Sequence, residues 1–269
     1  MKGYTKEERD EIKKIRLNQE VVTNQGYVAK CINYNNAHDI IIEFQDKYKA
    51  RVHTSWQMFQ QGKTLNPYHP KRHGEIKGNK YPSVINGFFV KEYILWENMI
   101  IRCCDKKEKE KSKNHSYQNV ICCDEWLNYE NFYEWLHSQS NFDKWYEGKR
   151  WAVDKDIFVK RNKIYSPENC CLVSQNVNCL FLKREAERGI YPIGVSYKEN
   201  EGFVAACNNP LTNRREELGC YSTPEKAFVA YKNYKEDIIK QVAKIEYNKG
   251  NITKECYEAM LNYMVEIND

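Results

Sequence analysis

The fold depends most on residues 151–178, which read Trp151-Ala-Val-Asp-Lys-Asp-Ile-Phe-Val-Lys-Arg-Asn-Lys-Ile-Tyr-Ser-Pro-Glu-Asn-Cys-Cys-Leu-Val-Ser-Gln-Asn-Val-Asn178. The run from Ala152 to Ile157 predicts a short strand that ends in charged residues. A turn is expected at residues 160–162, and Pro167 then leads into the apolar pair Leu172-Val173. The stretch ends at Asn178, so charged and amide side chains lie close to both apolar runs.

This order resembles the ββα-metal (HNH) finger of homing and phage endonucleases, in which a strand ends in Asp-His, a loop with an asparagine follows and a short helix supplies the last ligand. The resemblance implies that Asp154 is the first Mg²⁺ ligand, with Asp156 as a second carboxylate nearby. Asn178 falls near the last ligand of the family, and Asn162 or Asn169 matches its middle asparagine. Mg²⁺ is therefore the expected cofactor of an active finger.

Lys155 stands at the catalytic position, where the family has its general-base histidine. A lysine has an unperturbed pKa of about 10.4 and would need a pKa lower by roughly three units to act as a base near neutrality. Asp154 and Asp156 on either side favour its charged form. We therefore expect a catalytically silent finger that is kept for its shape or for phosphate contact. The alternative is an active finger whose base is His115 or His137.

The preceding region, residues 88–145, has apolar residues at helical spacing. Its phrases 95–103 and 123–135 also resemble the segment upstream of the finger in the phage family, so the resemblance covers residues 88–181. Because aromatic stripes at this spacing normally face inward, we expect these side chains to form a core rather than a base-stacking surface. The residues concerned are Tyr93, Trp96, Met99, Ile100, Cys103, Trp126, Tyr129, Phe132, Trp135 and Leu136.

The N-terminal part is expected to hold a short helix and a small β-domain. Residues 4–17 are charged, and Thr5 followed by Glu8 matches a helix capping box. From residue 18 to about 80, short β-rich runs alternate with turn sequences, which predicts a small antiparallel barrel or curled sheet. A similar domain often precedes the nuclease-like part in phage HNH proteins.

Residues 191–236 predict three short strands and a helix that is capped by Ser222 or Thr223. This layout resembles the ethylene-response-factor (APETALA class) DNA-binding domain, whose sheet lies in the major groove. The resemblance implies that Tyr197, Lys198, Arg214 and Arg215 face DNA. We expect further phosphate contacts from Lys155, Lys160 and Arg161. Residues 237–269 predict a helical hairpin that packs on the domain or supports a homodimer.

Composition permits nucleic-acid binding, because the net charge is +5 and the pI is about 8.5. The eleven cysteines form no Cys-x-x-Cys pair, so we expect reduced thiols and no zinc. The charged N-terminus and the absence of an apolar run of ~20 residues predict a cytoplasmic protein without membrane contact.

We therefore expect a multidomain α+β protein. It would comprise a helix (1–17), a β-barrel-like domain (18–80), an aromatic helical region with the degenerate finger (88–181), an APETALA-like sheet and helix (191–236) and a helical hairpin (237–269). The favoured function is binding of double-stranded DNA on a degenerate HNH scaffold. A metal-dependent nicking endonuclease is the first alternative, and a phage protein that inhibits a host protein is the second.

Overall fold

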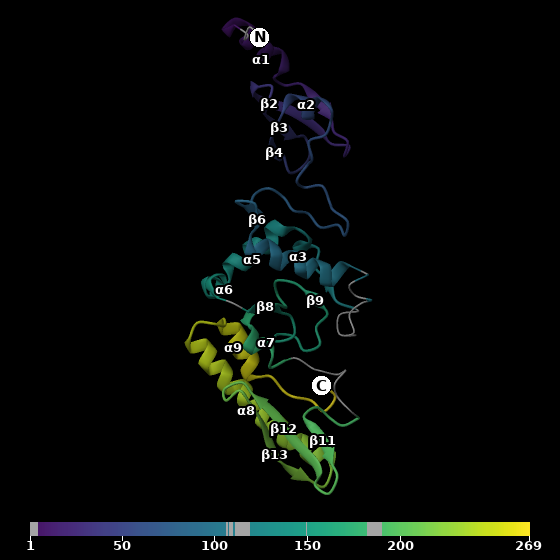
Figure 1. Cartoon of the computed structure of the whole chain (residues 1–269), viewed down its shortest axis with the longest axis vertical. Helices are drawn as coiled ribbons and strands as arrows, with labels where there is room; N and C mark the ends of the chain where they lie inside the picture. The colour runs from purple at the N-terminus through teal and green to yellow at the C-terminus, as the bar shows by residue number, and fades with distance from the viewer. Residues whose placement is uncertain (1–4, 106, 108–109, 111–118, 149, 182–189) are drawn as a thin grey trace. The chain divides into compact units, whose positions relative to one another are not determined.

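The computed structural model describes residues 5–105, 107, 110, 119–148, 150–181 and 190–269. It is a mixed α+β structure whose sheets are small, as Figure 1 shows. The α+β class expected from the sequence is confirmed. The chain divides into two compact units, Met1–Tyr93 with Leu127–Glu130, and Ile94–Trp126 with Asn131–Asp269. No helix of the described ranges is long and apolar enough to cross a bilayer.

In the first unit, helix α1 (Lys6–Arg16) begins at the predicted capping box. The Thr5 hydroxyl accepts the Glu8 N–H at 3.2 Å, and the Glu8 carboxylate accepts the Thr5 N–H at 2.7 Å. Two N–H groups that a helix start leaves unpaired are thereby satisfied. The capping prediction is confirmed.

The expected barrel-like domain is instead an open four-stranded antiparallel sheet. Its strands β1 (Glu20–Val22), β2 (Val28–Asn36), β3 (Asp39–Phe44) and β4 (Arg51–Thr54) pair in chain order. β1 has three residues and β4 has four, and each pairs on one side only, so the sheet does not close. Helix α2 (Trp56–Gln60) contributes Trp56 and Phe59 to the core on the buried face.

A buried carboxylate fixes the segment that follows this sheet. Glu130, in the first turn of α5 (Tyr129–Ser138), accepts the Tyr68 hydroxyl at 3.0 Å and the N–H groups of Asn79 and Lys80 at 2.9 and 2.7 Å. Burial and this carboxylate raise the pKa of Tyr68 to about 12. Gly78 has φ +69° and lies so close that a Cβ there would overlap the Glu130 side chain. Beyond it, β5 (Val84–Ile85) and β6 (Phe88–Phe89) form a hairpin.

The aromatic core is formed by α3 (Lys91–Cys104), the 3-10 helix η2 (Glu125–Leu127), α5 and α6 (Phe142–Glu147), most of whose residues belong to the second unit. The Trp96 indole donates a hydrogen bond to the Trp126 carbonyl at 2.7 Å. The Trp126 ring packs against the rings of Phe132 and Trp135. Nine of the ten residues predicted to form the core are buried, and Trp135 is partly buried, so that prediction is confirmed.

Residues 151–178 form two antiparallel strands and a short helix. β8 (Trp151–Asp154) pairs with β10 (Cys171–Ser174), with Asp154 opposite Cys171, and α7 (Gln175–Asn178) follows directly. The strand is shorter than the predicted run, because the chain turns after Asp154. β9 (Ile164–Tyr165), in the connection, pairs in parallel with β7 (Ile121–Cys122).

The C-terminal region has the predicted three strands followed by a helix. β11 (Val195–Lys198), β12 (Gly202–Asn209) and β13 (Arg214–Tyr221) form an antiparallel sheet, and α8 (Pro224–Asn248) follows. The Thr223 hydroxyl caps α8 by accepting the Lys226 N–H, and Pro224 lies in the first turn. A turn that contains Gly250 at φ +68° leads into α9 (Lys254–Leu261), which completes the predicted hairpin.

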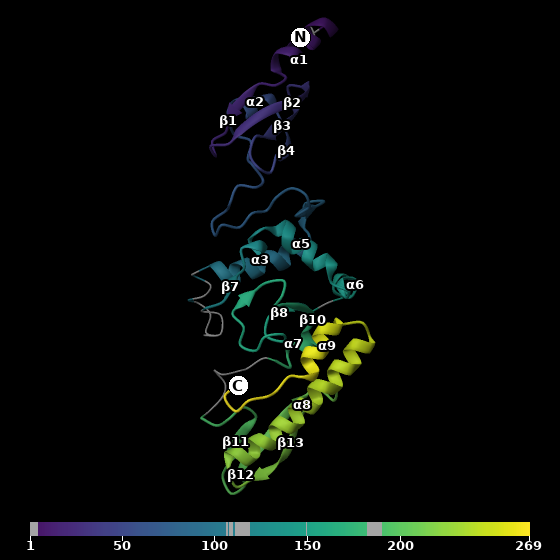
Figure 2. The same cartoon turned by 180° about the vertical axis from the view of Figure 1, so that it is seen from behind.

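Helix α8 belongs to two hydrophobic cores. Its first half packs along one face of the sheet β11–β13, which Figure 2 shows, and contributes Ala227, Phe228 and Tyr231. Its second half packs on α9 and on the finger (residues 151–178) with the short segment that follows it. The buried residues of this second core are Ile157, Cys171, Val173, Val177, Leu180, Phe181, Ile238, Ile239, Val242, Ala243, Ile252, Cys256 and Met260.

Asn141 ties this second core to β10, because its buried amide donates to the carbonyls of Leu172 at 2.7 Å and Asn251 at 2.9 Å. We expect Asn141→Ala to lower the free energy of unfolding by about 2 kcal/mol, since the buried Leu172 carbonyl and the partly buried Asn251 carbonyl lose their donor. Urea denaturation measures the change. The exposed Asn233→Ala on α8 is the control and should change stability by less than about 0.5 kcal/mol. Equal losses in both variants would contradict the role of the buried amide.

Candidate functional site

The Asp154 side chain closes the turn that follows β8. Its Oδ1 accepts the N–H groups of Asp156 at 2.8 Å and Ile157 at 2.9 Å. Asp154 is buried, and burial raises the pKa of its carboxyl to about 6 even though the two N–H donors oppose that change. The predicted first metal ligand therefore has one oxygen committed to its own turn.

The Lys155 ammonium is held inside the same turn. It donates to Asp156 Oδ2 at 2.6 Å and to the Asn162 carbonyl at 2.8 Å, and the side chain is almost fully buried. An ammonium group that donates in this way has no lone pair with which to take a proton from water. Mg²⁺ would also have to compete with this cation for Asp156, so the donor set does not fit the metal as it stands.

Asn162 is the asparagine that organises the loop. Its amide donates to the carbonyls of Lys155 at 2.9 Å and Ile164 at 2.7 Å, and its oxygen accepts the Ile164 N–H at 3.0 Å. Asn169 contributes a backbone hydrogen bond to Ser166 instead. Asn162 and Asn169 are the two candidates for the middle asparagine of the finger, and among the described residues only the Asn162 side chain bridges the loop in this way.

Asn178 lies at the end of α7 and is partly buried. Its carbonyl accepts the Phe181 N–H at 3.1 Å, whereas no hydrogen bond among the described residues joins its side chain to Asp154 or Asp156. His137 is exposed and its ring stacks on Tyr133, with a centroid separation of 3.9 Å. His115 lies outside the described residues.

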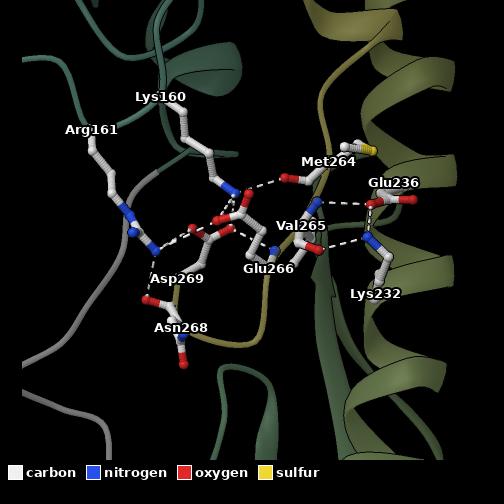
Figure 3. Close-up of polar contacts among 9 residues, drawn as sticks. All are labelled: Lys160, Arg161, Lys232, Glu236, Met264, Val265, Glu266, Asn268 and Asp269. Carbon is white, nitrogen blue, oxygen red and sulfur yellow. Dashed lines mark hydrogen bonds and ion pairs between the residues drawn. The ribbon is translucent and has the colours of Figure 1, made fainter.

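Lys160 and Arg161 bind the C-terminal segment (residues 264–269), as Figure 3 shows. Lys160 Nζ lies 2.6 Å from Asp269 Oδ2, 2.8 Å from the Met264 carbonyl and 3.4 Å from Glu266 Oε2. The Arg161 guanidinium donates to the Asn268 carbonyl at 3.0 Å and lies 3.6 Å from the carboxylates of Glu266 and Asp269. Both cations expected to contact phosphate therefore have anionic partners within the chain.

The C-terminal segment is also attached to α8, by two hydrogen bonds drawn in Figure 3. The Val265 carbonyl accepts from Lys232 Nζ at 2.6 Å, and the Val265 N–H donates to Glu236 Oε1 at 2.7 Å. Asp269 itself is buried. The segment thus joins the finger turn at residues 160–161 to α8.

The predicted DNA-facing residues of the sheet fall on two faces. Glu216 accepts the Tyr234 hydroxyl of α8 at 2.6 Å, so strand alternation places Arg214 on the helix side and Arg215 on the opposite side. Lys198 pairs with Glu217 at 2.9 Å and with Glu201 at 3.2 Å. The Lys198 ammonium is therefore already paired with two carboxylates.

Tyr197 keeps 54% of its surface exposed, and its ring contacts the edge of Phe203. Arg214 and Arg215 are exposed, and neither has an ion pair within the described part of the chain. These three side chains are therefore the predicted DNA contacts that internal carboxylates leave open.

The metal-type side chains that lie together in the described residues are Glu201, Glu217 and Cys220, all exposed. The Lys198 ammonium already binds both carboxylates. All eleven cysteines are free thiols, and burial raises the pKa of Cys122 and of Cys170. A thiol that is harder to ionise is a poorer metal ligand.

Sequence reasoning missed Lys235. This residue lines a cleft of about 710 Å³, together with Arg214 and Arg215. Burial lowers the pKa of the Lys235 ammonium. The signal was present in the sequence, because positions 231, 235, 238 and 242 follow the helical period that marks the buried stripe of α8, and Lys235 is the charged member.

The buried Asp154 carboxylate predicts an unusual pH dependence. Its folded pKa of about 6 lies above the unfolded value of about 3.9, so wild-type stability gains from this group as pH falls from about 6 to about 4. Asp154→Asn keeps the acceptor oxygen and removes the charge. We expect it to be more stable than wild type by about 2 kcal/mol at pH 8, and this advantage to disappear near pH 4.

Urea denaturation at pH 8 and pH 4 measures the difference. Asp156→Asn is the matched control and should lower stability at pH 8, because it removes the carboxylate that pairs with Lys155. An Asp154→Asn protein that is less stable than wild type at pH 8 would show that the folded state favours the Asp154 charge.

No protein-family model matches this chain, and neither a curated protein nor a solved structure matches it. The family resemblance of residues 88–181 and 191–236 is therefore an expectation from sequence motifs alone. Function has to follow from the chemistry of the residues themselves.

Proposed function

We propose that this protein binds double-stranded DNA, and that its nuclease-like finger is catalytically silent. The observation that carries the proposal is the pair Arg214 and Arg215 at the start of β13, which are exposed cations without an ion pair in the described residues. Free guanidinium groups bind phosphates and the O6 and N7 atoms of guanine bidentately. The net charge of +5 favours a polyanionic partner.

The polar side chains of the finger turn already bond to one another and to its backbone, which supports a catalytically silent finger. Asp154 accepts two backbone N–H groups, and Asp156 pairs with Lys155. The general base that hydrolysis of a phosphodiester needs has no candidate at the position of Lys155. The finger then serves as a rigid element between the aromatic core and α8.

The sheet supplies the contact surface in this proposal. Arg215 extends from the face opposite α8, and Tyr197, opposite Phe203 on the edge strand β11, offers an exposed ring for stacking or apolar contact. The resemblance to the APETALA-class domain implies that such a sheet lies in the major groove. Because Lys198, Lys160 and Arg161 are neutralised by carboxylates, the affinity rests on few cations and should be modest at physiological salt.

The proposal predicts that the double variant Arg214→Gln, Arg215→Gln binds duplex DNA at least about 10-fold more weakly than wild type. Loss of two phosphate contacts would also reduce the slope of log affinity against log salt by about 1.8. Fluorescence anisotropy with a labelled duplex, at about 50 and about 200 mM salt, measures both quantities. Lys244→Gln is the control, because Lys244 is exposed on the second half of α8, which packs on α9 and the finger instead of the sheet. It should bind within about twofold of wild type.

A plasmid assay tests the silent finger in the same preparation. Supercoiled DNA incubated with Mg²⁺ or Mn²⁺ should be retarded on a gel and should not be nicked. Metal-dependent nicking that Asp154→Ala abolishes would overturn the silent finger in favour of the endonuclease. Absence of duplex binding at low salt would overturn the proposal and leave a protein partner as the remaining hypothesis.

A further inference from the structure

The cleft that contains Lys235 is built from three parts of the second unit. The finger helix and the residues after it contribute Asn176 and Leu180, the sheet contributes Asn208, Arg214 and Arg215, and α8 contributes Lys235. Its volume of about 710 Å³ lies within the range of about 300 to 1,000 Å³ that is usual for small-molecule sites. The cleft therefore has room for a group as large as a nucleotide.

Lys235 is a cation without a counter-ion in this cleft. No ion pair or hydrogen bond involves its ammonium within the described residues, and burial lowers its pKa. The groups that act on it electrostatically are the thiols of Cys207 and Cys179, not carboxylates. Burial raises the pKa of Cys207, so that thiol stays neutral. A partly buried charge that lacks an anionic partner is costly, and a bound anion would reduce that cost.

The surroundings of Lys235 add positive charge. Arg214 and Arg215 line the same cleft, and neither has an ion pair in the described ranges. Glu216 interacts electrostatically with Arg214 and lies outside the lining. Glu216 is held by the hydroxyls of Tyr234 at 2.6 Å and Thr212 at 2.9 Å, and these hydrogen bonds lower its pKa. Both oxygens of the Glu216 carboxylate thus already accept hydrogen bonds from hydroxyl groups.

The polar lining contains donors suited to an oxyanion. Asn176, Asn208 and Asn213 lie on the cleft wall and are exposed, and each amide carries two donor hydrogens. Lys235 and Arg214 on the α8 side, with several amide donors, match a phosphate, which has three or four acceptor oxygens and up to two charges. A single carboxylate would leave most of these donors and charges unused.

From this geometry we infer that the Lys235 cleft binds a phosphate group, carried by a nucleotide or by a nucleic-acid strand. The inference deepens the proposed function, since it assigns one phosphate contact to a defined cleft that sequence motifs did not indicate. Lys235 anchors the phosphate, and Arg214, which lies on the α8 side of the sheet, contacts it from the rim. The finger helix takes part through Asn176, so a bound phosphate would contact both the finger and the sheet.

The test uses the full chain with inorganic phosphate and deoxyadenosine 5′-monophosphate, and with deoxyadenosine as the uncharged comparison, at constant ionic strength. Titration calorimetry and phosphorus-31 NMR should detect binding of the first two and not of the nucleoside. Lys235→Met keeps the apolar stem and removes the charge, so it should weaken both phosphate ligands at least about 10-fold. The matched control Lys244→Met, an exposed lysine on the same helix, should stay within about twofold.

Thermal unfolding separates loss of the site from loss of the fold. Lys235→Met should melt at or above the wild-type temperature without phosphate, because burial disfavours the lysine charge in the folded state. Phosphate should raise the melting temperature of wild type and not that of Lys235→Met. Equal phosphate binding by wild type and Lys235→Met, or no phosphate binding by wild type at low salt, would overturn the inference.

Duplex DNA distinguishes the two sources of phosphate and keeps the two proposals apart. If Lys235→Met weakens duplex binding as well, the phosphate belongs to a nucleic-acid strand. If it weakens the nucleotide alone, the cleft is a nucleotide site. If wild type does not bind duplex DNA but binds phosphate through Lys235, the proposed function is overturned and the phosphate site in the cleft is supported. If wild type binds duplex DNA but neither inorganic phosphate nor the nucleotide, the proposed function is supported and the phosphate site in the cleft is overturned.

Discussion

The packing of α8 against two cores is the constraint on which the second unit depends. The finger by itself has strands of four residues and a helix of four, and such short elements bury too little surface to be stable alone. Ile238, Ile239 and Val242 of α8, with Met260 of α9, complete its core. Because the first half of the same helix covers the sheet, one helix supports both the finger and the sheet.

This arrangement decides which charges are available to a partner. The C-terminal segment returns along α8 and brings Glu266 and Asp269 to Lys160 and Arg161. The sheet turns bring Glu201 and Glu217 to Lys198. Arg214, Arg215 and Lys235 have no ion pair in the described residues, and they line one cleft. Of the cations predicted to contact DNA or phosphate, only Arg214 and Arg215 stay unpaired within the described part of the chain, and they border the cleft that contains Lys235.

The same principle accounts for the finger. In the family that it resembles, a histidine after the aspartate acts as the base, whereas here Lys155 lies inside the turn and bonds to Asp156 and to the Asn162 carbonyl. Asn162 returns a hydrogen bond to the Lys155 carbonyl. The lysine therefore contributes to the shape of the loop. The side chains at the positions of the metal ligand and the base in that family stabilise the turn in this protein.

Local features were determined by the sequence alone: the capping box at Thr5, the cap at Thr223, the aromatic core and the order of three strands and a helix. Each depends on residues close together in the chain, where periodicity and side-chain chemistry are sufficient. Only the tertiary structure decided the open sheet, the pairing of Lys160 with a segment about 100 residues later, and the cleft around Lys235. Those outcomes depend on which distant carboxylates and helices meet, and residue spacing carries no information about such encounters.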